Sequence, residues 1–226
     1  MTRTERYHSD PKFREELLAK NKARRDKNKE AYSATRQEWY KKHGQVQRVS
    51  ERRRRSVLKD EFIQAYGGCS ECGCTELEFC VADHVNDDGG ILRKSREHGF
   101  GTQLYKWARD NGYPPTLQCL CHNHNTKKEI NRVGRGDSYA ARWYRKIRAE
   151  ALIIYGEVCR CCNESDPDML HIDHIDGGGA QQRRELSKSE FYKWLRDNGY
   201  PPGYQTLCAN CNSSKHYGGG VCIHKR

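Results

Sequence analysis

The stretch KWARDNGYPP, residues 106–115, decides the fold because the chain contains it twice. It recurs as KWLRDNGYPP, residues 193–202, with nine of the ten positions identical at an offset of 87. Agreement of this length within one chain indicates an internal repeat, and each copy of a repeat is expected to fold as one unit. The sequence therefore predicts two modules of the same architecture.

The repeat extends in both directions from this stretch. Downstream, the offset of 87 aligns Cys121 with Cys208 and His124 with Cys211. Upstream, an offset of 90 aligns a Cys-x2-Cys pair and an Asp-His pair, namely Cys69, Cys72, Asp83 and His84 with Cys159, Cys162, Asp173 and His174. The difference between the offsets is a shortening by three residues that falls between the motifs, so both motif blocks are intact in both copies.

The repeat and the charge pattern divide the chain into four segments. We expect a basic helical arm over residues 1–60, a first module over 61–132, a linker helix over 133–150 and a second module over 151–226. In each module the repeated stretch is expected to form a helix that ends at Asn-Gly, because glycine adopts the left-handed conformation that stops a helix. Asp10-Pro11 supplies a cap and a first-turn residue for a helix in the arm.

Positive charge is concentrated in the arm. Residues 1–60 contain 19 Lys and Arg against 9 Asp and Glu, which accounts for +10 of the chain's net charge of +11. This excess favours a polyanionic partner, most simply nucleic acid bound through its phosphates. We expect the densest cluster, Arg52-Arg53-Arg54-Arg55, to contact the phosphate backbone; the alternative is a solvated helix or a disordered basic tail.

Composition limits the class of protein. Hydrophobic residues make up 35% of the chain and the mean hydropathy is −1.06, so two small domains with an external staple fit better than one large apolar core. No signal-like apolar segment opens the sequence, and no apolar run approaches the length of a membrane span. We therefore expect an intracellular protein without a membrane partner, in which the 12 Cys stay reduced and the clustered ones bind metal rather than form disulfides.

The alignment groups these cysteines into two sets of four metal ligands. Module 2 offers Cys159-x2-Cys162 and Cys208-x2-Cys211, which is the spacing of a tetrahedral structural zinc site. Module 1 offers Cys69-x2-Cys72 and Cys121-x2-His124, in which one imidazole replaces a thiolate. We expect two structural Zn²⁺ ions per chain, which would supply folding free energy that small polar modules lack. The alternative is buried, unliganded thiols.

Other cysteines and histidines fall outside these sets. Five Cys have no Cys as counterpart in the other copy, and we interpret them as packing or spare thiols: Cys74, Cys80, Cys119, Cys161 and Cys222. His122 aligns with Ala209, so a surface position is expected for it. For the segment Cys222-x-His224 the sequence allows a metal site or a frayed end, and we favour the frayed end.

A second set of polar residues is shared by the two copies and is not needed for zinc. It comprises Asp83, His84, Asn125 and Lys128 in module 1 and Asp173, His174, Asn212 and Lys215 in module 2. The Asp-His pairs are flanked by apolar residues, which predicts the end of a strand, whereas Asn and Lys fall in the first turns of a helix on nearly the same face. Carboxylate and amide oxygens suit Mg²⁺, and a neutral His can accept a proton from water. The alternative is a structural Asp-His pair.

This order of motifs resembles the zinc-stapled branch of the HNH endonuclease family, in particular its phage-encoded and homing-type members. The shared phrases are YGG-C-x2-C, IDHIDGGG, GYPP and LC-x2-CN, and the resemblance covers residues 61–132 and 151–217. It implies an α+β fold in which two tandem ββα-metal modules follow the basic arm. It also implies a bacterial cytoplasmic location if the chain is phage-encoded.

The resemblance implies a role for each shared residue. His84 and His174 would be general bases, Asp83 and Asp173 would bind a catalytic Mg²⁺ or another divalent ion, and Asn125 and Asn212 would be the last residue of the family motif. Lys128 and Lys215 would hold a neighbouring phosphate. The middle Asn of the motif has no counterpart, since Thr116 and Gly203 occupy its place.

The function implied is that of a metal-dependent DNA endonuclease, with RNA as an alternative substrate. Two modules in one chain would allow it to act as a monomer. The rival hypothesis has the same fold but no catalysis. In it the chain is a zinc-module factor that binds nucleic acid or protein through degenerate HNH centres.

Overall fold

The computed structural model describes residues 2–91, 99–132, 136, 138–186 and 188–226, and its chain divides into two compact units, Met1–Arg54 and Arg55–Arg226. The boundary lies within helix α3 (Lys29–Tyr66), shortly before the predicted end of the arm at residue 60. Both predicted modules lie in the second unit. The predicted linker helix includes residues 133–135 and 137, which are outside the described residues.

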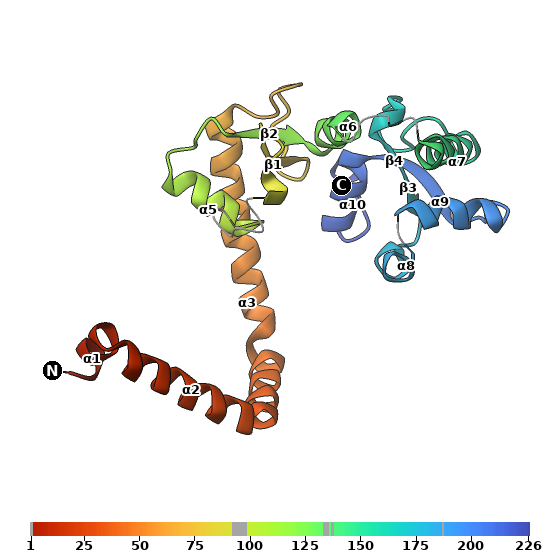
Figure 1. Ribbon diagram of the computed structural model, residues 1–226. Coiled ribbons are helices and arrows are strands. Elements are labelled where there is room, and N and C mark those ends of the chain that lie inside the picture. The colour runs from red at the N-terminus through yellow and green to blue at the C-terminus, as the bar shows by residue number, and fades with distance from the viewer. Residues whose placement is uncertain (1, 92–98, 133–135, 137, 187) are drawn as a thin grey trace. The chain divides into compact units, whose positions relative to one another are not determined.

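The first unit is helical, as predicted for the arm (Figure 1). It contains α1 (Arg3–Ser9), α2 (Pro11–Lys27) and the first part of α3. Asp10 caps α2, because its Oδ1 accepts the backbone N–H of Phe13 at 3.0 Å, and Pro11 occupies the first turn. Neither α1 nor α2 buries a residue, so these helices present polar side chains to solvent.

The second unit contains two antiparallel hairpins, each followed at once by a helix (Figure 1). In module 1, β1 (Cys80–His84) pairs with β2 (Leu117–Cys121), and α6 (His122–Arg132) follows. In module 2, β3 (Leu170–His174) pairs with β4 (Tyr204–Cys208), and α10 (Ala209–Tyr217) follows. In both modules the first strand ends at the His of the Asp-His pair, as predicted. The chain is thus a mixed α+β structure with two small two-stranded sheets.

The repeated stretch forms a helix between the strands of each module. These helices are α5 (Thr102–Asp110) and α9 (Lys188–Asp197). Both stop as predicted, since Gly112 and Gly199 have φ values of 67° and 66°. The remaining elements of the described residues are α7 (Tyr139–Tyr155), the short helix α8 (Gly179–Glu185) and the 3-10 turns η1 (Pro167–Met169) and η2 (Ile223–Lys225).

Each module has a small apolar core of its own. The last turns of α3 supply Leu58, Phe62 and Ile63 to module 1, and α7 supplies Ile147, Ala151 and Leu152 to module 2. The repeated helices and the strands complete the two cores with Leu104, Tyr105 and Leu117 in one and Leu170, Leu195 and Leu207 in the other. Helices α3 and α7 therefore play the same part, and burial is divided between two cores, as the composition predicted.

A reciprocal contact joins the modules at the first turns of α6 and α10. The side-chain oxygen of Asn123 accepts the backbone N–H of Asn210 at 2.9 Å, and the side-chain oxygen of Asn210 accepts that of Asn123 at 3.0 Å. These residues are counterparts at the offset of 87, so the contact is of the kind formed by a two-fold axis. Each helix thus satisfies an N-terminal N–H group of the other.

Further polar contacts cross between the modules. Lys127 pairs with Asp166 at 2.7 Å, and Glu78 of module 1 receives hydrogen bonds from Ser214 and Arg226 of module 2. Ile223 packs against both the core of module 2 and the small apolar cluster around Phe79. The last residues of the sequence therefore contact both modules.

Helix α3 is long, but it is too polar to be a membrane-spanning helix. It has 38 residues, yet none of the helices in the described parts of the chain is both long and apolar enough to cross a membrane.

Candidate metal centres and candidate active site

Both predicted sets of zinc ligands come together in space. Within each set the ligand atoms lie within 4.8 Å of one another; the sets are Cys69, Cys72, Cys121 and His124, and Cys159, Cys162, Cys208 and Cys211. The Nδ1 atom of His124 lies 3.6 Å from Cys69 Sγ and 3.2 Å from Cys121 Sγ. A tetrahedral zinc ion would separate a sulfur and a nitrogen ligand by about 3.5 Å. Both groups can therefore hold a metal ion such as zinc.

The thiols of these groups have perturbed acidity. Burial raises the pKa of Cys121 to about 12. In module 2 the hydrogen bond between Cys159 and Cys208 raises the pKa of Cys208 to about 12 and holds that of Cys159 well below its usual value. Burying several thiols together thus disfavours their simultaneous ionisation, and a bound divalent cation would offset the negative charge of the thiolates.

A third group of metal-ligating atoms lies in module 2. It consists of Cys161, Cys211, Cys222 and His224, again within 4.8 Å of one another. The frayed end that we favoured was wrong, because Cys222 is only 6% exposed. Cys161 and Cys222 pack in the core of module 2, as expected of packing thiols, and their positions also allow them to bind a metal ion. The repeat concealed this group, since Cys161 aligns with Glu71 in module 1.

The Asp and Lys of the second set of shared polar residues form an ion pair in both modules. Lys128 Nζ donates to Asp83 Oδ2 at 2.6 Å and to the backbone oxygen of His84 at 2.7 Å. Lys215 Nζ donates to Asp173 Oδ2 at 2.7 Å and to the backbone oxygen of His174 at 2.5 Å. Burial opposes the charge of Lys128, but hydrogen bonds to Asp83 and Asp87 raise its pKa above the usual value. The ammonium thus holds the Asp carboxylate and the turn that follows the strand.

A glutamine in each module also binds this carboxylate. Gln118 lies opposite Asp83 in the strand register and donates from Nε2 to Asp83 Oδ2 at 2.8 Å. Gln205 lies opposite Asp173 and makes the same bond at 3.0 Å. We did not predict this role, although the two Gln are counterparts at the offset of 87 and the match was available in the sequence.

The imidazole of His174 has a defined orientation. Its Nε2 lies 2.7 Å from Gln182 Oε1, and its ring packs on Tyr204 with centroids 4.7 Å apart. With the amide oxygen assigned as acceptor, the ring donates its Nε2–H, and Nδ1 is the nitrogen that can accept a proton. The module 1 counterpart of Gln182 falls in residues 92–98, outside the described residues.

A glycine lies directly against the second nitrogen of each His ring. A Cβ atom on Gly179 would lie 2.9 Å from His174 Nδ1, and one on Gly89 would lie 2.6 Å from His84 Nδ1. Both distances are shorter than real Cβ contacts. These counterpart glycines therefore keep Nδ1 clear of a side chain.

The candidate residues of module 2 share a cavity. Asp173, His174, Asn212 and Lys215 all line a cavity of about 1520 Å³. From module 1, Asn125 lines this same cavity, whereas Asp83, His84 and Lys128 lie outside its described lining. The structure thus gathers all four predicted residues in module 2 and, in module 1, joins Asp83 to Lys128 at the end of β1.

At Thr116 and Gly203, where the resemblance would place a middle Asn, a backbone hydrogen bond makes the connection in both modules. The N–H of Val85 donates to the carbonyl oxygen of Thr116 at 3.0 Å, and the N–H of Ile175 donates to that of Gly203 at 2.9 Å. The loop after each His is thus attached to the residue that precedes the second strand without a side-chain amide.

His122 is not the surface residue that we expected. Its Nε2 atom is buried, and this burial, with a smaller effect of nearby Lys59 and Arg55, lowers its pKa to about 4. The segment His122-Asn123-His124 therefore contains a half-buried imidazole, a residue of the contact between modules and a member of a metal group.

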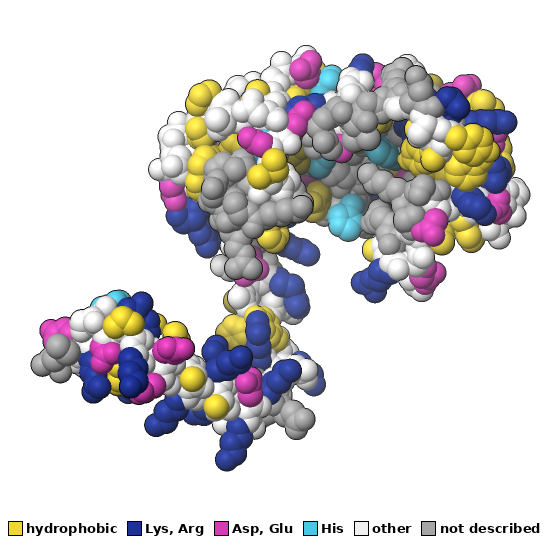
Figure 2. All heavy atoms as spheres, viewed as in Figure 1, with side chains coloured by type: hydrophobic (Ala, Val, Ile, Leu, Met, Phe, Trp, Pro, Cys, Tyr) yellow, Lys and Arg dark blue, Asp and Glu magenta, His cyan; other side chains and the backbone are white. Residues whose placement is uncertain are grey.

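The basic cluster lies on α3, where Arg52, Arg53 and Arg54 are exposed and Arg55 is half-buried with its guanidinium 5.8 Å from the ring centre of Tyr217. Figure 2 shows Lys and Arg side chains distributed along the helices of the arm. These positions leave the first three guanidinium groups accessible to a partner.

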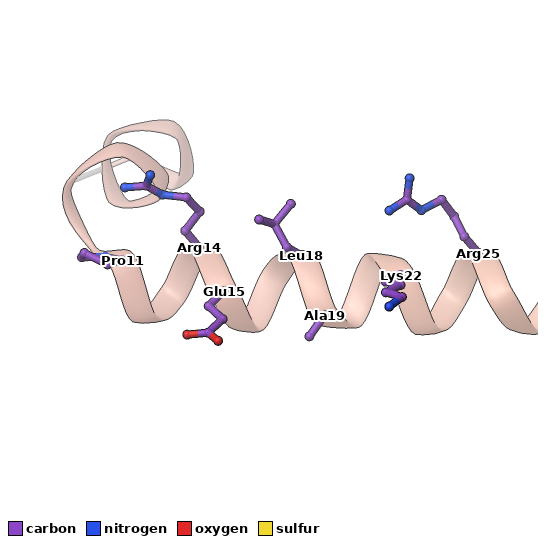
Figure 3. Close-up of a pocket in the computed structure, with 7 residues that line it drawn as sticks. All are labelled: Pro11, Arg14, Glu15, Leu18, Ala19, Lys22 and Arg25. Atoms are coloured by element: carbon purple, nitrogen blue, oxygen red, sulfur yellow. The ribbon is translucent and has the colours of Figure 1, made fainter. Parts of the chain in front are cut away.

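A second hollow of about 430 Å³ is lined by α2 alone. Figure 3 shows Arg14, Leu18 and Arg25 on one side of this helix and Glu15 and Ala19 on the other. Its polar groups do not converge on a common point, so it is not a candidate site.

Comparisons with protein-family models, with curated proteins and with solved structures found no match to this chain.

Proposed function

We propose that the chain is a metal-dependent endonuclease of HNH type, with zinc-stapled ββα-metal modules, that hydrolyses phosphodiester bonds in DNA. The observation that carries this proposal is the cavity of module 2, in which a carboxylate, an imidazole and an amide line one space together with a lysine. A candidate base, a candidate pair of oxygen ligands and a cation on one cavity fit phosphodiester hydrolysis. We take module 2 as the principal cutting centre.

His174 is the general base in this proposal. With Gln182 Oε1 as acceptor the ring carries its proton on Nε2, and the lack of a side chain at Gly179 leaves Nδ1 unblocked as the base. The ring is held by Tyr204, so its orientation does not have to be acquired when substrate binds. His84 has the same glycine neighbour and would play the same part in module 1.

The donor set fits a hard divalent cation such as Mg²⁺. Asp173 and Asn212 would hold it, and the ion would supply stabilisation of negative charge on the phosphate. Gln205 and Lys215 both bind Oδ2 of Asp173, which orients the carboxylate. Asp83 and Asn125 would be the corresponding ligands in module 1.

The test is nicking of a supercoiled plasmid with Mg²⁺ by wild type, His84→Ala, His174→Ala and the double variant. Loss of a general base typically lowers the rate by about 10²–10⁴. We expect His174→Ala to lose most activity, and Gly179→Ala to lower it because a methyl group 2.9 Å from Nδ1 would displace the imidazole. His216→Ala is the control, because this exposed imidazole lines the same cavity.

Zinc content is measured on every variant so that loss of the fold is separated from loss of chemistry. Full activity in the double variant, or no metal-dependent cleavage of DNA by the wild type, would contradict the proposal. The same assay on RNA distinguishes the two nucleic acids.

One observation favours the rival function of a non-catalytic binding factor. In both modules the lysine ammonium already neutralises the Asp carboxylate, and Lys215 also bonds the backbone oxygens of His174 and Ile175. An Asp-Lys pair of this kind stabilises a turn without any metal. Tight DNA binding without cleavage by the wild type would support this alternative.

A further inference from the structure

The third group of metal-ligating atoms is a site that the two predicted zinc sets do not account for. It shares Cys211 with the four-cysteine set and adds Cys161, Cys222 and His224. Cys222 and His224 come from the last residues of the sequence, and Cys161 comes from the Cys159–Cys162 segment, which we call the knuckle of module 2. Four soft ligands from three segments of chain thus meet at one point.

The distances within this group match a tetrahedral site. His224 Nδ1 lies 3.4 Å from Cys211 Sγ, 3.7 Å from Cys222 Sγ and 3.8 Å from Cys161 Sγ. Tetrahedral geometry with ordinary zinc–ligand bond lengths gives a sulfur–nitrogen separation of about 3.5 Å. The predicted site of module 1, which also has three thiols around one imidazole, shows 3.2 and 3.6 Å for the same type of pair.

We infer that module 2 binds two zinc ions in a binuclear cluster, with the thiolate of Cys211 as the bridging ligand. One ion takes Cys159, Cys162, Cys208 and Cys211, and the other takes Cys161, Cys211, Cys222 and His224. The chain as a whole then binds three zinc ions.

The difference between the two modules supports the bridge. The fourth ligand of the first set is His124 in module 1 and Cys211 in module 2. An imidazole nitrogen has one lone pair and binds one metal, whereas a thiolate sulfur has several and can bind two. Cys161 aligns with Glu71, so the thiol that Cys161 offers to the third group is also specific to module 2.

The surroundings of the third site give it a structural role. The His224 ring packs near Phe79 of module 1 with centroids 5.2 Å apart, and Arg226 pairs with Glu78 of module 1. An ion bound here would attach the last residues of the sequence to the knuckle of module 2 while they contact module 1. It would therefore stabilise the contact between the modules.

Zinc content per folded chain tests the inference. We expect three zinc ions in wild type and two in Cys222→Ser and in Cys211→His. The second variant gives module 2 the ligand set of module 1, so the first ion keeps four ligands while the bridge is removed. His124→Cys is the matched control and is expected to keep three ions, as is His216→Ala, which removes a nearby exposed imidazole outside all three groups.

The bridge has its own spectroscopic signature. In the full chain reconstituted with ¹¹³Cd²⁺ we expect three ¹¹³Cd resonances, two of which split each other by coupling through Cys211 Sγ. Cys211→His should abolish the splitting and leave the resonance of module 1 unchanged. Two ions in the wild type, or three resonances without mutual coupling, would overturn the binuclear cluster.

Discussion

Lys128 and Lys215 perform the same local task in the two modules. Each lysine joins an Asp carboxylate to the backbone oxygen of the following His, and so holds the end of a strand to the helix that follows the hairpin. We predicted these residues as phosphate contacts, and that remains a prediction. Their observed bonds show that they also fix the carboxylate on which a catalytic ion would depend.

Lys59 gives a prediction about stability at the residue scale. It is 7% exposed, and burial lowers its pKa to about 8. Because this value lies below the ordinary 10.5 of an unfolded chain, the charged form destabilises the fold at pH 7, and this cost disappears as the pH rises from 8 to 10.5. We expect Lys59→Met to raise the free energy of unfolding by about 1–3 kcal/mol at pH 7.

The measurement is denaturant unfolding of both proteins over this pH range. The advantage of the variant should shrink above pH 8. Lys146→Met, on an exposed position of α7, serves as control and should show no such pH-dependent difference. An advantage that stays constant up to pH 10.5 would contradict the assignment to the charge of Lys59.

At the scale of elements, the two modules show how one sequence pattern produces one supersecondary unit. A strand that ends at Asp-His, a second strand that ends at a Cys of a candidate metal group and a helix that begins at the next residue recur with the same register. The helix start follows the strand without a loop, so the Asn four residues beyond the Cys has little freedom. This rigidity is what a candidate metal site requires.

Helix α3 gives the prediction for nucleic-acid binding. Arg52, Arg53 and Arg54 are exposed on it, and each phosphate that a protein neutralises contributes about 0.9 to the slope of log affinity against log salt. We expect the triple change to Gln to weaken binding to duplex DNA and to lower this slope by about one for each phosphate that is no longer bound. The measurement is fluorescence anisotropy over a series of salt concentrations.

The control removes the same charge from outside the arm. Lys106, Lys193 and Lys225 are exposed in the second unit, and changing them to Gln should leave most of the affinity and the slope unchanged. Equal losses of affinity in the two triple variants would show that only net charge matters, against a specific role of the arm.

At the scale of the molecule, the reciprocal contact of Asn123 and Asn210 connects the modules. Each side chain satisfies a backbone N–H of the other helix, and Asn123 is buried. We expect Asn123→Ala and Asn210→Ala each to lower the free energy of unfolding by about 1–2 kcal/mol. The double variant should lose less free energy of unfolding than the sum of the two single losses, because both bonds belong to the same contact between the modules.

Urea unfolding of the zinc-loaded proteins measures this coupling. Asn111 and Asn198 form the control cycle, since they are also counterparts but each bonds within its own module, to Trp107 and Trp194. Their changes to Ala should add. Additivity in the Asn123 and Asn210 cycle would mean that the two bonds are independent of each other.

Sequence predicted the features that lie within one module and recur in the other. The ends of the strands at His84 and His174, the stops at Gly112 and Gly199 and the two predicted groups of metal-ligating atoms all follow from local pattern and spacing. The features that it did not predict depend on contacts between distant segments. The lowered pKa of His122 depends in part on Lys59 and Arg55 of α3, and the third metal group depends on Cys161 and Cys222, which have no Cys as counterpart in module 1.

The reciprocal asparagine contact also bears on the origin of the chain. Self-complementary surfaces arise most simply between identical subunits, so the tandem arrangement has the character of an ancestral homodimer whose two genes were joined. In a single chain the two halves can differ while the contact between them persists. Module 1 has an imidazole at His124 where module 2 has a sulfur at Cys211. A tandem chain thus allows one half to carry candidate ligands that the other half lacks.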